Sequence, residues 1–237
     1  MTSVLAEVGK NIKIVMEQSN YIEIAKIIEH TLLKPGANKD DIKNLCKEAV
    51  EYQFHGVCVP PYYVRLAKEY LKDEPAKVIT VIGFPFGYQT KGTKVEETKK
   101  VIEDGADEID MVINIAAFKS EDLNYVREDI ESIATICRLR NKALKVIIET
   151  CLLSPEEIIK ICELVGEVGV DFIKTSTGFN GEGATVENVK LIRQSTPLRI
   201  KIKAAGGIKT RAFAEELIKA GADRIGTSSG IAIVTGS

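Results

Sequence analysis

Gly169-Val170-Asp171-Phe172-Ile173-Lys174 is the stretch that best indicates the fold of this chain. A helical pattern ends just before its glycine and an apolar strand begins just after it, so the glycine is expected to cap the helix. Gly105-Ala106-Asp107 and Gly221-Ala222-Asp223 repeat the arrangement elsewhere in the sequence. This recurrence predicts a repeated unit in which each helix leads into a parallel strand.

Strands and helices alternate along the chain. Eight strands are expected, at residues 27–30, 56–59, 77–82, 108–114, 144–149, 170–175, 199–203 and 223–226. Seven helical patterns lie between them, at 39–52, 61–71, 94–104, 124–140, 154–168, 186–194 and 210–220. Without a linker rich in proline, glycine or serine, they predict one α/β domain over residues 1–237, a single (β/α)8 TIM barrel with an N-terminal helical extension at 1–26. A doubly wound open sheet is the alternative fold.

Polar and apolar residues alternate within the expected strands. In the strand at 108–114, the polar positions share one face and the apolar positions share the other. Because helices cover the outside of a parallel barrel, the apolar residues should face the helices and the polar ones the interior. We therefore expect Asp110, Glu149, Lys174 and Lys203 to converge inside the barrel.

Two lysines, Lys174 and Lys203, are expected to end neighbouring apolar strands, and a glycine-containing turn follows each. Burying an ammonium is unfavourable unless it loses its proton or gains a partner. A second positive charge nearby disfavours protonation, and a neutral lysine can attack a carbonyl and form a Schiff base. The pair therefore predicts an enzyme that acts on a carbonyl compound. Lys201, two residues earlier, is interpreted as a structural ion-pair partner.

Active sites of such barrels lie at the C-terminal ends of the strands. Glu29, Cys58, Asp110 and Glu149 are also expected there, although Cys58 alone is more typical of a small buried hydrophobe. Glu149 alone could simply neutralise a barrel lysine. Loops after the last three strands can bind an anion through backbone N–H groups and hydroxyls. Their candidate residues are Thr177, Gly178, Gly206, Gly207, Gly226, Ser228 and Ser229. The combination predicts a phosphorylated carbonyl substrate.

Composition excludes several other classes of protein. The net charge is −2, so no overall field attracts nucleic acid or an anionic membrane. No apolar run approaches the roughly 18 residues of a membrane span, and the N-terminus lacks a signal-peptide pattern. The five scattered cysteines indicate reduced thiols in a cytoplasmic protein. With only His30 and His55 available, a multi-histidine metal site cannot be built, and no metal or other cofactor is expected.

Seven stretches of the sequence resemble motifs of the deoxyribose-phosphate aldolase family. They lie, in the family's order, at residues 29–35, 78–85, 105–112, 145–150, 172–179, 203–207 and 224–230. The most specific feature is the joint presence of Phe172-Ile173-Lys174-Thr175-Ser176-Thr177-Gly178-Phe179, Lys203-Ala204-Ala205-Gly206-Gly207 and Asp110. The resemblance implies a metal-independent class I aldolase in which Lys174 forms the Schiff base while Asp110 and Lys203 transfer protons. The implied reaction is reversible cleavage of a small phosphorylated sugar, 2-deoxy-D-ribose 5-phosphate, into acetaldehyde and D-glyceraldehyde 3-phosphate.

The same resemblance implies roles for other positions. Substrate contacts would come from Glu29, Thr31, Cys58, Thr177 and Gly178, and phosphate contacts from Gly206, Gly207, Gly226, Ser228 and Ser229. Three positions depart from the family pattern. Glu29 stands where many members carry aspartate, Pro60-Pro61 replaces Asn-Pro, and Phe179 replaces a lysine found in some members.

Two other functions fit parts of the pattern. A phosphosugar isomerase would share the phosphate loops and use a carboxylate base, for which Glu149 is the candidate. A non-catalytic sugar-phosphate sensor could use the same scaffold. Because a barrel of this size usually pairs through its helices, a homodimer or homotetramer is expected.

Overall fold

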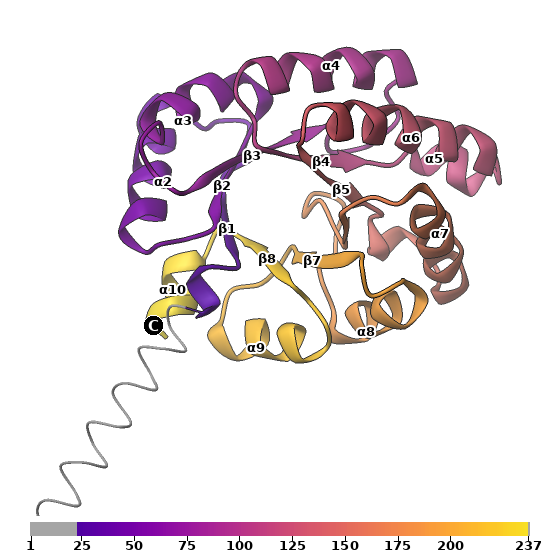
Figure 1. Cartoon of the computed structure of the whole chain (residues 1–237). Helices are drawn as coiled ribbons and strands as arrows, with labels where there is room; N and C mark the ends of the chain where they lie inside the picture. The colour runs from indigo at the N-terminus through magenta and orange to yellow at the C-terminus, as the bar shows by residue number, and fades with distance from the viewer. Residues whose placement is uncertain (1–22, 237) are drawn as a thin grey trace, which may run out of the picture.

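The structure, a computed structural model, describes residues 23–236. Eight parallel strands form a closed barrel in which each strand pairs with the next and β8 pairs with β1. The strands are β1 (Ile28–Thr31), β2 (Gly56–Val59), β3 (Lys77–Ile82), β4 (Glu108–Val112), β5 (Ala143–Ile147), β6 (Phe172–Lys174), β7 (Lys201–Ala205) and β8 (Arg224–Thr227). Helices surround the barrel (Figure 1). The predicted (β/α)8 barrel is confirmed, and the open-sheet alternative is wrong.

The helices follow the strands in the predicted order. They are α2 (Lys39–Glu51), α3 (Val64–Tyr70), α4 (Lys91–Glu103), α5 (Ile115–Lys119), α6 (Leu123–Leu139), α7 (Pro155–Val168), α8 (Val186–Ser195), α9 (Arg211–Lys219) and α10 (Gly230–Thr235). Two 3-10 turns, η1 (Pro61–Tyr63) and η2 (Thr150–Leu152), follow β2 and β5. The sequence reading missed α5, α10 and η2, because elements this short show little periodicity. Of the expected extension at 1–26, residues 1–22 lie outside the described residues and 23–25 are helical.

Local signals set the ends of α7. Ser154 caps the helix by accepting from the Glu157 N–H group, and the Glu157 side chain accepts from the Ser154 N–H group. Pro155 occupies the first turn, where its missing N–H group costs no hydrogen bond. The helix ends at Gly169, whose φ of 75° lies in the left-handed region that glycine adopts readily. Both ends agree with the sequence prediction.

The aspartates of the repeated Gly-x-Asp motif have a role that sequence reasoning did not assign. Each stands directly before a strand: Asp107 before β4, Asp171 before β6 and Asp223 before β8. Their Oδ2 atoms accept hydrogen bonds, 2.8–2.9 Å long, from the backbone N–H groups of Val78, Leu144 and Ile202 on the preceding strands. Each aspartate therefore ties the start of one strand to its neighbour.

The barrel interior divides into an apolar part and a charged part. Ile79 and Val81 of β3 pack with Cys58 of β2 into a small buried cluster inside the barrel. They lie in register with Glu108 and Asp110 of β4, so these four side chains share the inner face. The outward-facing residues of the strands belong to the main core beneath the helices. The prediction that polar residues face the interior is confirmed for β4. It does not hold for β3, whose Ile79 and Val81 also face the interior.

Candidate active site

Lys174 and Lys203 are neighbours on adjacent strands, directly paired in register. Both are buried, with 3% and 0% of their surface exposed. Lys174 ends β6 as predicted, but the prediction that Lys203 ends its strand is wrong, because β7 continues to Ala205. The closed barrel staggers its strands, so residues at one level need not be strand ends. Lys201 is exposed, and its Nζ lies 5.7 Å from the centre of the Phe172 ring. The prediction that Lys201 is an ion-pair partner is wrong, because it forms no ion pair within residues 23–236.

Asp110 of β4 connects the two lysines. Its Oδ2 accepts hydrogen bonds from Lys174 Nζ at 2.9 Å and from Lys203 Nζ at 2.6 Å. Burial raises the pKa of Asp110, but the positive charges of Lys145, Lys174 and Lys203 outweigh this and hold the pKa well below its usual range. Asp110 is therefore a carboxylate at neutral pH. It can accept a proton or stabilise a cation at this position.

Lys203 is held as an ammonium. Burial lowers its pKa, but the carboxylates of Asp110 and Glu29 overcome that effect and raise the pKa above the ordinary lysine value. Lys203 Nζ contacts Glu29 Oε2 as well as Asp110. The second positive charge that the sequence reading placed beside Lys174 is therefore present in the geometry.

Two cations that sequence reasoning did not select complete the charged interior. Lys145 Nζ lies 2.5 Å from Glu108 Oε2, 3.2 Å from Asp110 Oδ1 and 3.3 Å from Glu29 Oε1. These are ion pairs by distance, although none has hydrogen-bond geometry at the lysine. Burial lowers the pKa of Lys145, but the surrounding carboxylates raise it overall. Arg224 lies 3.1 Å from Glu29 Oε1. Lys145 could have been selected from the sequence, because the alternation in the expected strand at 144–149 puts it on the polar face.

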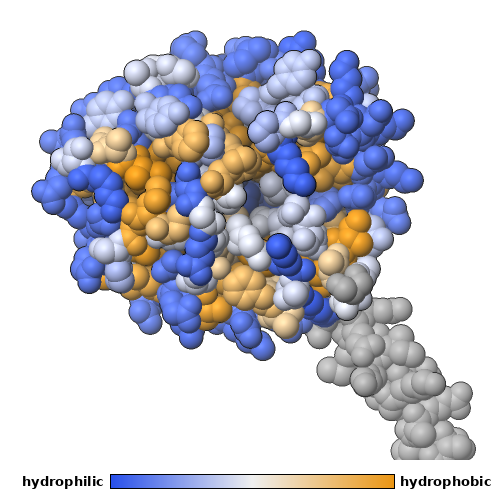
Figure 2. Space-filling view, turned by 180° about the vertical axis from the view of Figure 1, so that it is seen from behind, coloured by the Kyte–Doolittle hydropathy of each residue, from blue (hydrophilic) through white to orange (hydrophobic). Residues whose placement is uncertain are grey.

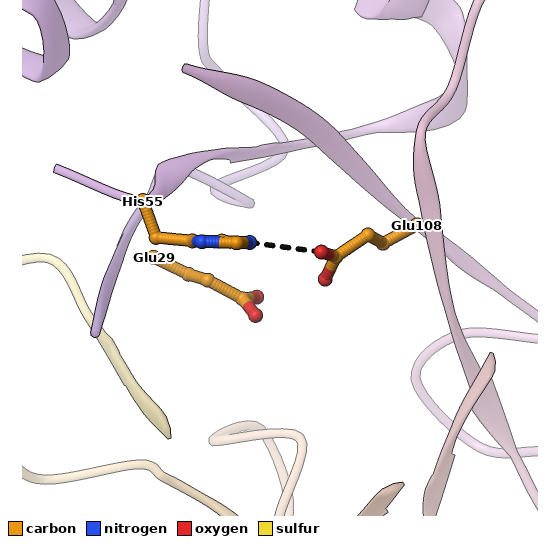
Figure 3. A group of neighbouring side chains, drawn as sticks. All are labelled: Glu29, His55 and Glu108. Carbon is orange, nitrogen blue, oxygen red and sulfur yellow. Dashed lines mark hydrogen bonds and ion pairs between the residues drawn. The ribbon is translucent and has the colours of Figure 1, made fainter. Parts of the chain in front are cut away.

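Glu29, His55 and Glu108 point toward one another in the barrel interior, an arrangement that could hold a metal ion (Figure 3). His55 Nε2 lies 2.8 Å from Glu108 Oε1. However, Lys145 and Arg224 already contact both carboxylates. A divalent cation would meet these positive charges at close range, so the donor set fits an ion-pair network better than a metal centre.

A cavity of about 270 Å³ lies above the buried lysines, between the loops that follow β1, β6, β7 and β8. Eight expected residues line it: Thr31, Lys174, Thr177, Gly178, Gly206, Gly207, Gly226 and Ser228. Lys34 and Lys209, which sequence reasoning did not select, also line it, and none of its lining residues is acidic. In Figure 2, residues of near-neutral hydropathy surround a hollow near the centre of the view. The lining suits a small anionic ligand.

Five expected site residues lie outside this lining. Glu29, Cys58, Asp110 and Lys203 are fully buried. Burial raises the pKa of Cys58 to about 11, so Cys58 is a neutral thiol. Ser229 does not line the cavity, and its backbone N–H group donates to Thr227 Oγ1 at 2.9 Å. The structure therefore separates a cavity wall of small residues from a buried charged group beneath it.

Glu149 does not join the lysines, contrary to expectation. It follows β5 with a φ of 54°, in the left-handed region. Its carboxylate accepts hydrogen bonds from the Thr177 N–H group at 3.0 Å, from the Thr177 hydroxyl, and from Asn180 Nδ2 at 2.8 Å. Glu149 therefore shapes the loop after β6 and lies among donors that occupy both of its oxygens.

Comparison with known proteins gives consistent results. A family model described as DeoC/LacD family aldolase matches residues 24–236. The deoxyribose-phosphate aldolase of Thermococcus gammatolerans is 55% identical over 218 residues, covering 91% of this chain and 97% of that protein. The one of Caldicellulosiruptor saccharolyticus is 55% identical over 214 residues, covering 90% and 97%. The tetrameric deoxyribose phosphate aldolase structure from Aeropyrum pernix matches with a TM-score of 0.85 and 30% identity, covering 91% of each chain.

Proposed function

This chain belongs to the DeoC/LacD family of aldolases, and we propose that it cleaves 2-deoxy-D-ribose 5-phosphate reversibly, with Lys174 as the Schiff-base lysine. The names of its relatives support the substrate. The observation that carries the chemistry is the position of Lys174. Its amine lies in the wall of a cavity without acidic lining residues, 2.9 Å from a carboxylate oxygen that also binds a second lysine.

Imine formation is the first half of the proposed mechanism. Uncharged Lys174 attacks C1 of the open-chain aldehyde and forms a carbinolamine, which loses water to give a protonated imine. Asp110, whose carboxylate lies 2.9 Å from Lys174 Nζ, can accept the proton that the attacking nitrogen releases and return it to the alkoxide oxygen, which becomes the carbinolamine hydroxyl. Lys203, held as an ammonium, can donate the proton that leaves with the hydroxyl as water.

Carbon–carbon cleavage is the second half. Transfer of the C3 hydroxyl proton to Asp110, directly or through water, lets the C2–C3 bond break, and D-glyceraldehyde 3-phosphate leaves as the aldehyde. The iminium accepts the electron pair and becomes an enamine. Protonation of the enamine at C2 and hydrolysis of the resulting imine release acetaldehyde and regenerate the Lys174 amine. The iminium itself is the electron sink, so this route needs no metal.

The phosphate end of the substrate is assigned to the loops after β7 and β8. Gly206, Gly207 and Ser228 line the cavity there, together with Lys209. Lys34 lines the cavity from the loop after β1. Backbone N–H groups and ammonium groups together suit a phosphate dianion. These two lysines can compensate for Phe179, which stands where some family members carry a lysine.

Assembly and location complete the proposal. We expect a homodimer or homotetramer, and the tetrameric relative from Aeropyrum pernix supports an oligomer. All five cysteines are free, which is typical of a reducing compartment, and we place the enzyme in the cytoplasm. Among the helices of residues 23–236, none is both long and apolar enough to cross a membrane.

Reductive trapping tests the proposed function. The protein is incubated with acetaldehyde and sodium borohydride and then digested for mass spectrometry. We expect a stable two-carbon adduct on Lys174, and neither adduct nor cleavage activity in Lys174→Ala. The matched control is Lys201→Ala, which replaces an exposed lysine of β7. This variant should keep both the adduct and the cleavage activity. An isomerase or a non-catalytic sensor would give no adduct, and full activity in Lys174→Ala would refute the assignment.

A further inference from the structure

The charged side chains inside the barrel nearly balance. Within residues 23–236, one group of buried ion pairs contains three carboxylates, Glu29, Glu108 and Asp110. These carboxylates pair with four lysine or arginine side chains. Those four are Lys145, Lys174, Lys203 and Arg224. If Lys174 is uncharged, three positive charges face three negative charges.

Arg224 and Glu108 belong to this group without touching the cavity above Lys174. Arg224 Nη1 lies 3.1 Å from Glu29 Oε1 and 3.6 Å from Glu108 Oε2, and the guanidinium lies 5.3 Å from the centre of the Phe172 ring. Neither residue lines the cavity that contains Lys174. Both line a separate depression at the opposite end of the barrel, where β4 and β8 begin.

The cluster connects these residues to Lys174 through short contacts. Glu108 contacts Lys145, and Lys145 contacts Asp110, whose other oxygen binds Lys174. Charges buried in protein interact over longer distances than charges in water, because less solvent screens them. A change of one charge at the far end therefore alters the cost of adding a proton at Lys174.

We propose that Arg224 and Glu108 are positioning residues that set the protonation of Lys174 from the opposite end of the barrel. The proposal rests on the proposed function, in which the uncharged amine is the reactive form. Arg224 supplies a positive charge that favours the uncharged amine, and Glu108 supplies a negative charge that opposes it. Because Arg224 Nη1 lies 3.6 Å from Glu108 Oε2, the two charges partly offset each other in the parent protein.

Other titratable groups around Lys174 fit this account. Asp110 and Lys203 contact it directly or through a shared oxygen, and Glu29 and Lys145 form the next layer. Cys58 of β2 is a neutral thiol, because burial raises its pKa to about 11. His55 Nε2 lies 2.8 Å from Glu108 Oε1, at the same end of the group as Arg224.

The test compares pH profiles of kcat/KM for the cleavage reaction. Arg224→Gln should move the midpoint of the acidic limb to higher pH, because the cluster then carries an excess of negative charge that favours protonated Lys174. Glu108→Gln should move the same limb downward. We expect each shift to be about half a pH unit or more, the size produced by one partly screened charge. Arg224→Lys, which keeps the charge, should leave the limb near its parent position.

The double variant Arg224→Gln with Glu108→Gln restores the balance and should return the limb toward the parent value. Circular dichroism confirms folding, and if Arg224→Gln does not fold, Glu108→Gln and the double variant decide the question. Limbs that stay in place in folded variants, with only kcat reduced, overturn the proposal and leave a structural role. Borohydride trapping of the parent separates the two hypotheses: without an adduct on Lys174 the proposed function fails, whereas an adduct with unmoved limbs defeats this inference alone.

Discussion

Lys174 and Lys203, paired in register on β6 and β7, donate hydrogen bonds to the same oxygen of Asp110. One carboxylate thus lies between the amine that must lose its proton and the ammonium that retains its own. Because Asp110 stays ionised, it can accept a proton from one lysine while holding the other in place. This relationship makes the contribution of Asp110 measurable separately from that of Lys174.

Replacing Asp110 with asparagine should reduce turnover while substrate binding persists. Asparagine nearly preserves the shape but removes the charge that holds both lysines. We expect kcat to fall by about 10²- to 10⁴-fold, the usual contribution of general acid–base catalysis, with KM changed only a few-fold. Steady-state cleavage kinetics measure both. Asp122→Asn, at the exposed N-cap of α6, is the matched control. An unchanged kcat in Asp110→Asn would remove Asp110 from the mechanism.

Replacing Glu149 with glutamine should weaken substrate binding without preventing imine formation. The Glu149 carboxylate accepts from Thr177 twice and from Asn180, and a glutamine cannot accept with both terminal atoms. Loss of one charge-assisted hydrogen bond in this loop should raise KM about tenfold. Borohydride trapping should still modify Lys174. Complete loss of turnover with binding intact would instead favour Glu149 as a base.

Lys34 and Lys209 should contribute to binding of the phosphorylated substrate alone. Both line the cavity. Lys34→Gln and Lys209→Gln should each raise KM for 2-deoxyribose 5-phosphate about tenfold, because each ammonium removed costs a charged hydrogen bond. Values of kcat/KM for unphosphorylated 2-deoxyribose are the internal comparison and should not change. Lys219→Gln, an exposed substitution on α9, is the control variant. Equal losses with both sugars would argue against a phosphate role.

Acid should destabilise the protein through Asp110 and Glu108. Burial raises the pKa of each carboxyl, but neighbouring cations lower both below the ordinary values of 3.8 and 4.5. A carboxyl with a depressed folded-state pKa contributes stability above its ordinary pKa and loses it as pH falls toward the folded value. The free energy of unfolding, from urea titrations, should therefore decline below about pH 4.5. A variant with both Glu108→Gln and Asp110→Asn should decline less, and a parent curve that rises on acidification would contradict the prediction.

A buried ion pair outside the active site should also matter for stability. Lys94 Nζ of α4 lies 2.5 Å from Asp129 Oδ2 of α6, and both side chains are fully buried. Lys94→Ala should cost about 3–5 kcal/mol, because it leaves an uncompensated buried carboxylate. Lys99→Ala on the same helix removes an exposed pair with Glu96 and should cost less than about 1 kcal/mol. Urea denaturation measures both, and similar small losses would show that Asp129 is neutral or rehydrated.

Most of the fold could be predicted from local patterns. The limits of β2 and β3 agree with the prediction residue for residue, and the helix cap at Ser154 fixes the start of α7. These signals are short-range: a cap, a glycine in the left-handed region, or an apolar run between polar turns. The short helices α5 and α10 escaped detection because a single turn contains too few residues to show a period.

The site was predictable only in part. Lys174, Lys203 and Asp110 could be selected from residue type and position in alternating strands, since chemistry restricts which buried polar groups a barrel tolerates. Three features could not be predicted from the sequence. They are the position of Lys203 inside its strand, the contact of Arg224 with Glu29, and the hydrogen bonds of Glu149 to the loop after β6. Arg224 and Glu29 are 195 positions apart in the sequence, and Glu149 and Thr177 are 28 positions apart. Barrel closure and strand stagger determine such meetings, and no local pattern in the chain encodes them.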